Sequence, residues 1–389
     1  MTWIIIISTL GFAAVIFFLR SGLYRLYYPS DSTSDSNQGQ NFSFSVVIAA
    51  RNEERSIEKC LQSVFSQDLP IERYEVIVIN DRSEDSTPEI LGNLQNQFKN
   101  LKIITIAETP AGISPKKYAV TKGIELASNE IIVFTDADCT VKPQWLSTIN
   151  NNFKADTAFV QGITSYRYVN GMNKIFFGLQ AVDFLSHGVI AAAAIGANLP
   201  INSNANNLAF RKSAFKEIGG YGSDSNVVSG DDDHLLQRVW KSKHWKVRFM
   251  ADNRAIVETE PPSTVSAVFE QRRRWGSVTV HYLPSQILLL SLVFQFYLLI
   301  AFTAIAAIFH HSFLSVFAGL LFVKFAGELI LLIPGTRIFG KKPLRKFILP
   351  ASLIHLPLVL GAVLLGVFCK FDWKGQKMSR TIDTAVSAK

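Results

Sequence analysis

Long apolar runs with few or no charged residues lie near both ends of the chain. The runs cover residues 3–19, 287–309, 312–334 and 347–369. Each run approaches or exceeds the roughly 20 residues that cross the apolar core of a bilayer as a helix. Only the third run carries charged side chains, which are Lys324 and Glu328. The pattern predicts an integral membrane protein with three or four spans.

Lys324 and Glu328 are four residues apart, so they lie on one face of their expected helix and can neutralise each other. Two interpretations stay open. One is a structural ion pair that faces a neighbouring helix, because a charge inside a membrane needs a partner. The other is a part in the passage of an acceptor.

Basic residues beside the runs predict the orientation of the chain. Arg20 and Arg25 follow the first run, and residues 336–346 hold five cations and no acid. Because cytoplasmic loops are rich in lysine and arginine, we expect the N-terminus outside and the following domain in the cytoplasm. The first run has no basic residue before it, which favours a retained anchor over a cleaved signal peptide. We expect a multi-pass protein of the inner or plasma membrane.

The tail after the last run is basic as well. It cannot share the cytoplasm with residues 336–346 if residues 347–369 cross the bilayer once. Pro350 and Pro357 allow a kinked or re-entrant segment there. The side of the membrane that the C-terminus reaches therefore stays open.

Between the two ends, short apolar segments alternate with segments of helical periodicity. The expected strands are 44–50, 75–80, 102–106 and 131–135, and the expected helices are 57–65, one that starts at 87–88, and 117–126. Apolar strands separated by helices predict an α/β fold, with a parallel sheet covered on both faces. We expect Asn52 to cap the first of these helices.

The chain is therefore expected to have five segments. They are an anchor (1–20), a juxtamembrane segment with a polar, Ser-rich linker (21–43), a cytoplasmic α/β domain (44–285), two or three C-terminal transmembrane helices (286–370) and a basic tail (371–389).

The amino-acid composition agrees with a membrane protein that also has an α/β domain. Hydrophobic residues make up 48% of the chain and charged residues 18%, below the roughly 25% of soluble domains. Much of the net charge of +8 lies beside the apolar runs, so we expect lipid head groups as partners rather than nucleic acid. Cys60, Cys139 and Cys369 show no metal-binding or CxxC spacing and are expected to be reduced thiols.

Acidic side chains follow two of the expected strands, at the end where parallel sheets bind ligands. Asp81 follows the second strand, and Asp136 and Asp138 follow the fourth. The absence of GxGxxG and GxxxxGK[ST] sequences disfavours a dinucleotide oxidoreductase and a P-loop ATPase. Two aspartates at this spacing can instead ligate Mg²⁺ or Mn²⁺, which would bridge the phosphates of a nucleotide. A single acid at such a place is often only a loop cap.

Two later segments have ordinary structural interpretations. Asp231, Asp232 and Asp233 stand before a helical pattern, where acids complement the helix dipole. Residues 271–275, Gln-Arg-Arg-Arg-Trp, form a basic segment shortly before an apolar run, and Trp275 would suit a membrane interface. On the residues alone, these interpretations are preferred.

Three features leave their roles open. Lys116 and Lys117 could contact phosphates or be ordinary surface lysines. Residues 189–195 are too few for a span and predict a buried or membrane-surface helix. The Asn-rich segment 198–207 predicts a loop, which could line the path of an acceptor.

Five motifs occur in an order that resembles inverting family-2 glycosyltransferases with the GT-A fold. They are AARNEE, VINDRSEDST, DAD, GDDDHLLQRV and QRRRW. The chain looks most like the membrane-embedded branch that includes cellulose, chitin and hyaluronan synthases and ceramide glucosyltransferase. The resemblance covers residues 44–275 and the flanking runs. It implies a Rossmann-like catalytic domain with a mainly parallel sheet.

The resemblance also implies donor-binding roles for the acids at the sheet edge. Glu53 would lie beside the base, Asp81 would contact the nucleoside, and Asp136 would touch the nucleotide. Asp138 would bind Mg²⁺ or Mn²⁺. Asn80 departs from the family pattern, in which many members have an aspartate, so its contact with the nucleotide stays open.

For the reaction itself, the resemblance changes the interpretation of two segments. It implies that Asp232 is the general base and that Gln271, Arg274 and Trp275 lie against the diphosphate and the acceptor sugar. An aspartate close to other acids suits a base, because its pKa is raised. Arg274 would stabilise the charge of the departing diphosphate, and Trp275 offers a flat apolar surface to a sugar ring.

The expected function is metal-dependent, inverting transfer from a cytoplasmic nucleotide-sugar, taken to be a UDP-sugar. The acceptor would be a lipid-linked saccharide or lipid, or a growing polysaccharide. The smaller number of spans argues against a channel like that of the long-chain synthases. An alternative is a catalytically silent nucleotide-sugar-binding subunit of a membrane complex, although binding alone needs no base.

Overall fold

The computed structural model describes residues 2–28, 41–277, 282–368, 371–373 and 376–378. The chain divides into two compact units, each described here by itself. The sheet unit consists of Asp31–Val169, Asn202–Pro261 and Trp373–Lys389, and the helical unit of Met1–Ser30, Asn170–Ile201 and Pro262–Asp372. Most of the expected linker, most of the expected tail, and Cys369 lie outside the described residues.

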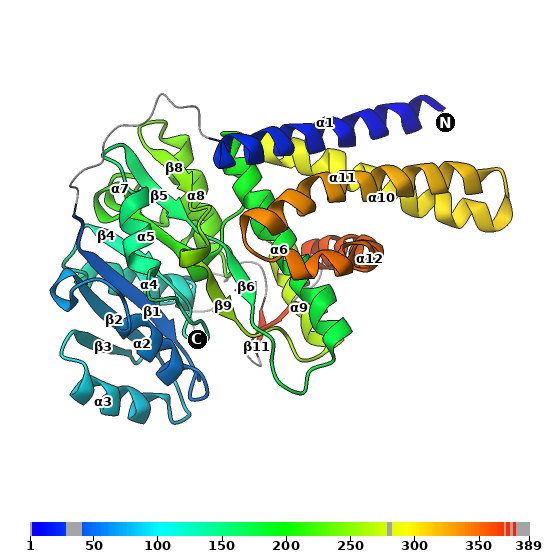
Figure 1. The fold of residues 1–389 in the computed structure, drawn as a ribbon. Coiled ribbons are helices and arrows are strands. Elements are labelled where there is room, and N and C mark those ends of the chain that lie inside the picture. The colour runs from blue at the N-terminus through cyan, green and yellow to red at the C-terminus, as the bar shows by residue number, and fades with distance from the viewer. Residues whose placement is uncertain (1, 29–40, 278–281, 369–370, 374–375, 379–389) are drawn as a thin grey trace. The chain divides into compact units, whose positions relative to one another are not determined.

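The sheet unit contains a seven-stranded sheet with the strand order β3-β2-β1-β4-β7-β5-β8 (Figure 1). Its strands are β1 (Phe44–Ala50), β2 (Tyr74–Asp81), β3 (Leu101–Ile106), β4 (Ile131–Phe134), β5 (Thr157–Gln161), β7 (Leu208–Arg211) and β8 (Lys246–Phe249). β7 runs antiparallel to β4 and β5, and the other pairings are parallel. The predicted mainly parallel α/β sheet is confirmed.

Shorter elements complete the strands of the chain. They are β6 (Thr164–Tyr166) and β9 (Val257–Thr259), which pair in parallel, and β10 (Phe371–Trp373) and β11 (Gln376–Met378) near the C-terminus.

Helices cover both faces of the sheet because successive residues of its buried strands point to opposite sides. Val46 and Ile48 of β1 pack in one core cluster, and Val47 packs in the other. The first cluster contains α2 (Ile57–Phe65), α3 (Thr87–Gln97) and α5 (Trp145–Asn152), and the second contains α4 (Pro115–Leu126), α7 (Lys212–Glu217) and α8 (Asp231–Lys241). Gly123 lets α4 approach closely, since a Cβ there would overlap the side chains of Val47 and Ile79.

The predicted cap on the first helix is wrong. Ser56, not Asn52, precedes α2, and its side chain makes no capping bond. Asn52 lies four residues earlier with a φ of 53°, in a tight turn after β1. Its Oδ1 accepts a hydrogen bond from the backbone N–H of Glu84 at 2.9 Å, so its amide ties two loops together instead of capping a helix.

Asn207, the last residue of the Asn-rich segment, is a buried structural residue. Its Nδ2 donates to the carbonyl oxygens of Ile163 and Ala255, each at 2.8 Å, and its Oδ1 accepts from Trp145 Nε1 at 2.9 Å. These bonds use groups that would otherwise be buried without partners. Asn207 therefore joins separate parts of the sheet unit. The role suggested for the rest of the segment, along an acceptor path, stays a prediction.

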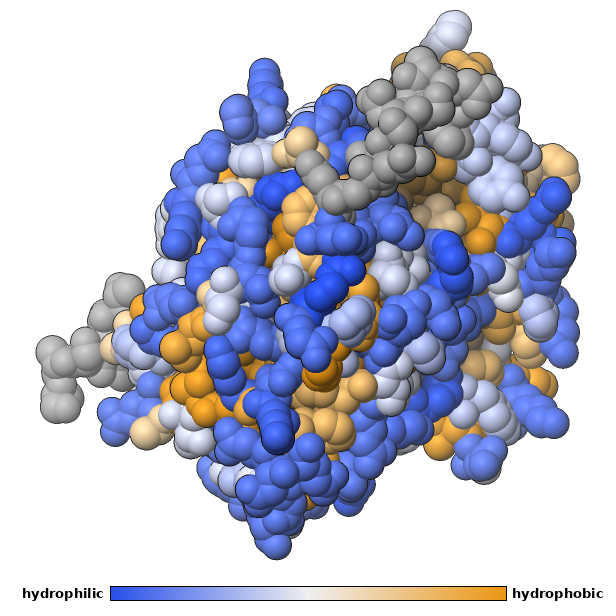
Figure 2. Space-filling view, turned by 60° about the vertical axis from the view of Figure 1, so that its left-hand side comes forward, coloured by the Kyte–Doolittle hydropathy of each residue, from blue (hydrophilic) through white to orange (hydrophobic). Residues whose placement is uncertain are grey.

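Hydrophilic side chains cover most of the face of the sheet unit that is turned forward in Figure 2. The apolar strands are enclosed below this surface, because the helices on both sides of the sheet bury them.

The helical unit contains long apolar helices and shorter, more polar ones. The long helices are α1 (Thr2–Tyr27), α6 (Lys174–Gly196), α10 (Pro284–Phe309), α11 (Phe313–Ile338) and α12 (Ile348–Phe368), and the shorter ones are α9 (Val265–Gly276) and η7 (Lys342–Phe347). Five segments of the described chain are long and apolar enough to cross a membrane. Four of them correspond to the runs expected from the sequence, and many of their large apolar side chains are exposed, Phe302 and Phe322 among them. Exposed apolar side chains on long helices suit contact with lipid.

The fifth candidate span is α6, which differs from the short helix predicted for residues 189–195. The helix begins far earlier because Asn173 caps it, with its side chain accepting from the N–H groups of Ile175 and Phe176. Gln180 and Asp183 interrupt the apolar sequence, yet both are buried inside the unit. Because these two polar residues interrupt the sequence, the apolar run 189–195 looked too short for a span, although the helix continues through them.

Two segments within residues 44–285, the α6 region and α9, belong to the helical unit. The domain boundaries expected from the sequence stay a prediction. Gly22 of α1 permits a close crossing with α6, since a Cβ there would overlap the Ala193 carbonyl oxygen. α9 packs on α12 at Gly276, which lies against the backbone of Ala362.

The predicted pairing of Lys324 with Glu328 is confirmed. Lys324 is fully buried, and its Nζ donates to Glu328 Oε1 at 2.6 Å and to the carbonyl and hydroxyl oxygens of Ser352, both at 2.7 Å. The three bonds satisfy all three ammonium donors. Tyr297 donates its hydroxyl to the same Glu328 oxygen at 3.0 Å. This contact set fits a structural pair.

Candidate functional site

The carboxyl ends of three adjacent parallel strands carry the acids predicted from the sequence. β2, β1 and β4 are neighbours, and Ala50 at the end of β1 is in register with Asn80 near the end of β2. Glu53 follows β1, Asp81 ends β2, and Asp136 follows β4 shortly before Asp138. The structure therefore brings these four carboxylates to one edge of the sheet.

Glu53 and Asp81 are held by neighbours in their own loops. Asp81 is buried and pairs with Arg82, whose Nε lies 2.8 Å from Oδ1. Glu53 Oε2 accepts from the Ser56 hydroxyl at 2.8 Å. Asn80, the departure from the family pattern, accepts a backbone N–H bond from Ser83 at 3.3 Å. Its amide therefore shapes the loop after β2.

Asp138 is exposed in the loop after β4, and its Oδ2 accepts from the Thr259 hydroxyl at 3.4 Å. Cys139 is buried beside it and is a free thiol, as is Cys60. Burial raises the pKa of the Cys139 thiol well above its usual value, and the charges of Asp138 and Asp136 raise it further. The Cys139 thiol is thus kept protonated, and Asp138 carries the exposed carboxylate of this loop.

Lys116 joins the acids of two elements. Its Nζ lies 3.4 Å from Asp136 Oδ1 and 3.4 Å from Asp231 Oδ2. The acidic start of α8 therefore lies beside the acids that follow β4, which the sequence alone did not reveal. One feature of the sequence could have placed Lys116 at the site. It stands in the first turn of α4, directly after the loop that leaves the carboxyl end of β3.

Lys117 has a different environment. Its side chain is buried, and its Nζ donates to the carbonyl oxygen of Asp224 at 2.6 Å and lies over the ring of Tyr221. Burial lowers the pKa of Lys117 to about 8. Of the two lysines left open above, Lys116 lies among the site carboxylates, and Lys117 supports the loop before α8.

The three aspartates that begin α8 differ in environment. Burial raises the pKa of Asp231, but the charges of Lys116 and Lys117 outweigh this and hold it below its usual value. Burial, followed by the charge of Asp231, raises the pKa of Asp232 to about 6. Asp233 Oδ1 accepts from the Ser203 N–H at 2.6 Å. The pKa values of Asp231 and Asp232 are therefore shifted in opposite directions. Such a difference lets one acid stay ionised while its neighbour exchanges a proton.

Gln271, Arg274 and Trp275 lie together on α9 of the helical unit. Thr264 caps this helix by accepting from the Ala267 N–H at 3.1 Å. Arg272 lies with its guanidinium 4.2 Å from the centre of the Trp275 ring, and its Nη1 donates to Gln271 Oε1 at 2.8 Å. One face of the indole is therefore covered by a residue within the motif.

Arg272 is the residue of this motif that the sequence left without a role. It is buried and forms an ion pair with Asp183 of α6, to which its Nε donates at 2.7 Å. Phe184 and His187 of the same helix contact the ring of Trp275. α6 therefore holds both Arg272 and Trp275 in place.

The acids at the sheet edge could bind a divalent cation, but they would supply only a few of its ligands. Among the residues that the structure describes, no three His, Cys, Asp or Glu side chains are grouped as a metal site. Mg²⁺ typically binds through one or two carboxylates and completes its shell with water and substrate phosphate oxygens. Asp138, exposed beside Asp136, suits such a site.

Comparison with known proteins identifies a family domain in this chain. Residues 45–219 match the family described as Glycosyl transferase family 2. The chain contains a family-2 glycosyltransferase domain. The predicted family and enzyme class of this domain are therefore confirmed.

Two relatives share this domain. Glycosyltransferase AglE of Haloferax volcanii is 29% identical over 204 residues, which cover 50% of this chain and 60% of the relative. Beta-monoglucosyldiacylglycerol synthase of Synechocystis sp. is 28% identical over 235 residues, which cover 59% of this chain and 46% of the relative. The chain thus spans about half the length of these curated relatives.

A solved structure supports the fold. Mannosyltransferase PcManGT of Pyrobaculum calidifontis, solved with GDP-Man and Mn²⁺, matches 94% of this chain and 98% of its own, with a TM-score of 0.59 and 16% identity. At this identity the likeness is one of fold. The GT-A fold expected from the motifs is confirmed for the glycosyltransferase domain.

The ion pair between Arg272 and Asp183 generates a stability prediction. Asp183→Ala leaves a buried, unpaired guanidinium, so the free energy of unfolding should fall by about 3–5 kcal/mol. The control is Glu270→Ala, which removes the more exposed pair with Arg273 and should cost at most about 1 kcal/mol. Unfolding in mixed detergent micelles, followed by tryptophan fluorescence, measures both. Equal effects of the two variants would contradict a structural role for the Asp183 pair.

Proposed function

We propose that the protein is a membrane-embedded, metal-dependent, inverting glycosyltransferase with its catalytic domain in the cytoplasm. It would move a sugar from a nucleoside-diphosphate sugar, taken to be a UDP-sugar, to a lipid-linked or saccharide acceptor. The observation that carries the proposal is the cluster at the sheet edge, where Asp231 and Asp232 differ in pKa and Lys116 links Asp231 to Asp136.

Asp232 has the properties of the base. In an inverting displacement, the acceptor oxygen forms a bond to the anomeric carbon while the bond to the diphosphate oxygen breaks, and the hydroxyl proton passes to a carboxylate. A pKa of about 6 leaves Asp232 ionised at neutral pH yet able to hold the proton. Asp231, kept ionised by Lys116, would remain charged throughout.

The departing nucleoside diphosphate gains negative charge, which basic groups would offset. We propose that Lys116 and Arg274 contact its oxygens, because charge-assisted bonds are strongest to a developing anion. Asp138, with Asp136 beside it, would hold Mg²⁺ or Mn²⁺, which supplies further charge stabilisation when bound. Glu53 and Asp81 would contact the nucleoside.

The acceptor is proposed from chemistry and from the relatives. Trp275 would support a sugar ring, and Gln271 would donate or accept bonds at its hydroxyl groups. The synthase from Synechocystis sp. is named for a glucosylated diacylglycerol, which supports a lipid acceptor at the bilayer. The five candidate spans support the same location.

A catalytically silent binding subunit is the alternative, and replacement of Asp232 separates the two. Asp232→Asn should lower kcat by about a hundredfold or more, because the acceptor loses its base, while donor affinity stays close to that of the wild type. The wild-type rate should also fall as the pH drops below about 6, as Asp232 becomes protonated. Initial rates with radiolabelled donor, measured between pH 5 and 8, test both effects.

The control is Asp156→Asn, at the opposite edge of the sheet, where Asp156 pairs with Lys246 and Arg248. It should keep near-normal turnover. Near-normal turnover by Asp232→Asn would instead remove Asp232 from the role of base.

Metal removal tests the assignment of Asp138. EDTA should abolish measurable donor binding, and Mn²⁺ or Mg²⁺ should restore it, because the carboxylates at the sheet edge repel a diphosphate without a cation between them. Asp138→Ala should require a higher Mn²⁺ concentration for the same binding. Isothermal titration with the donor measures both effects. Donor binding that is unchanged by EDTA would contradict the metal assignment.

A further inference from the structure

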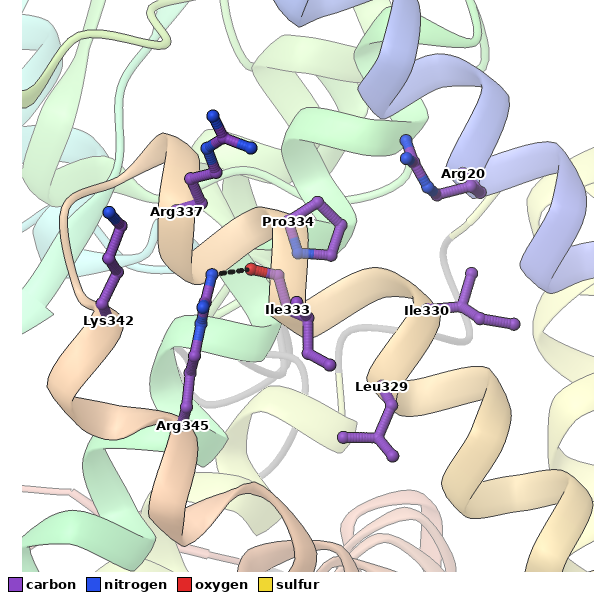
Figure 3. A pocket seen from close by; sticks show the side chains of 8 residues that line it. All are labelled: Arg20, Leu329, Ile330, Ile333, Pro334, Arg337, Lys342 and Arg345. Atoms are coloured by element: carbon purple, nitrogen blue, oxygen red, sulfur yellow. Dashed lines mark hydrogen bonds between the residues drawn. The ribbon is translucent and has the colours of Figure 1, made fainter.

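A pocket lies wholly within the helical unit, at the end of α11. It has a volume of about 640 Å³ and is shown in Figure 3. Cations from three elements line it: Arg20 of α1, Arg337 of α11, and Lys342 and Arg345 of η7. None of its described lining residues is acidic, so four positive charges share this pocket.

Acids in the described part of the chain do not neutralise these charges. Among the described residues, none of the four cations forms an ion pair with an acid. Arg345 is oriented instead by neutral acceptors, since it donates to the Ile333 carbonyl oxygen and to the Thr336 hydroxyl, each at 2.9 Å. Like charges gathered without an acid repel each other, so an anion bound among them would be stabilised.

The remaining wall of the pocket is apolar. Leu329, Ile330, Ile333 and Pro334 of α11 form it. Ile330 and Ile333 are exposed, and Phe322 is exposed farther along the same candidate span. The pocket therefore has a cationic end and an apolar side that continues along a candidate membrane helix. This matches a phospholipid at a bilayer surface, which has an anionic head group and apolar acyl chains.

We propose that this pocket binds an anionic phospholipid of the bilayer, with its phosphate among the four cations and an acyl chain along α11. Basic pockets between membrane helices are suited to anionic head groups, whose attraction adds to the hydrophobic contact. A free phosphate ion would leave the apolar wall without a partner. The site is separate from the proposed chemistry, and its test does not require turnover.

The test measures lipid binding by the full chain in a neutral detergent. Native mass spectrometry counts bound lipid during titration with phosphatidylglycerol or with phosphatidylcholine of the same acyl chains. The wild type should prefer phosphatidylglycerol. The double variant Arg337→Gln/Lys342→Gln should weaken this binding by about twenty-fivefold, that is, about fivefold for each cation removed. Both side chains are exposed, so their replacement leaves the packing of the unit intact.

The matched control is Lys346→Gln. Lys346 is an exposed cation of the same segment that does not line the pocket. Its replacement should change the affinity for phosphatidylglycerol by less than about twofold, because its charge is outside the site. An equal loss in the control and the double variant, or no loss in the double variant, would overturn the proposal.

Two competitors distinguish the source of the phosphate. Neither inorganic phosphate at millimolar concentration nor a polyisoprenyl monophosphate should displace phosphatidylglycerol. Displacement by inorganic phosphate would assign the pocket to a free anion, and displacement by the polyisoprenyl monophosphate would assign it to an acceptor lipid. Either result would overturn the proposal of a bilayer phospholipid.

Discussion

Repulsion among carboxylates at the carboxyl edge of the parallel sheet is the constraint on which the site depends. Parallel strands direct their ends to one place, so the acids after β1, β2 and β4 meet there, and the start of α8 adds more. Lys116 offsets part of this charge between Asp136 and Asp231. Burial, followed by the charge of Asp231, raises the pKa of Asp232, and the remaining negative charge leaves Asp138 suited to a divalent cation. Burial and this repulsion together give the site the properties that we propose for a base and for a metal ligand.

The helical unit also contains charged side chains that are buried in apolar surroundings and need partners. Arg272 is paired with Asp183, and Lys324 with Glu328 and Ser352, so each buried cation has close acceptors. Removing one partner of such a pair is costly because the other charge stays buried. The first pair joins α9 to α6, and the bonds of Lys324 to Ser352 join α11 to α12. Where cations instead line an open pocket without acids, the charge is available to a ligand.

Local patterns predicted the elements well, and contacts between distant residues were the part that they missed. The apolar segment 44–50 became β1 residue for residue, because burial on both faces leaves a clear signal. The length of α6 was missed because Asp183 interrupts its apolar run, and its partner Arg272 lies 89 residues away. Lys116 could not be distinguished from other lysines, since its acidic neighbours come from β4 and α8. Asn52 looked like a helix cap, but the turn after β1 uses its amide between two loops.

The anomeric configuration of the product tests the central claim most directly. The donor is first identified by incubating membranes that contain the protein with a panel of radiolabelled nucleotide-sugars and partitioning the products into organic, aqueous and insoluble fractions. The linkage formed from an α-linked donor is then determined by proton NMR. A base on the side of the sugar opposite the diphosphate predicts a β-linked product. An α-linked product would contradict inversion and the role of Asp232.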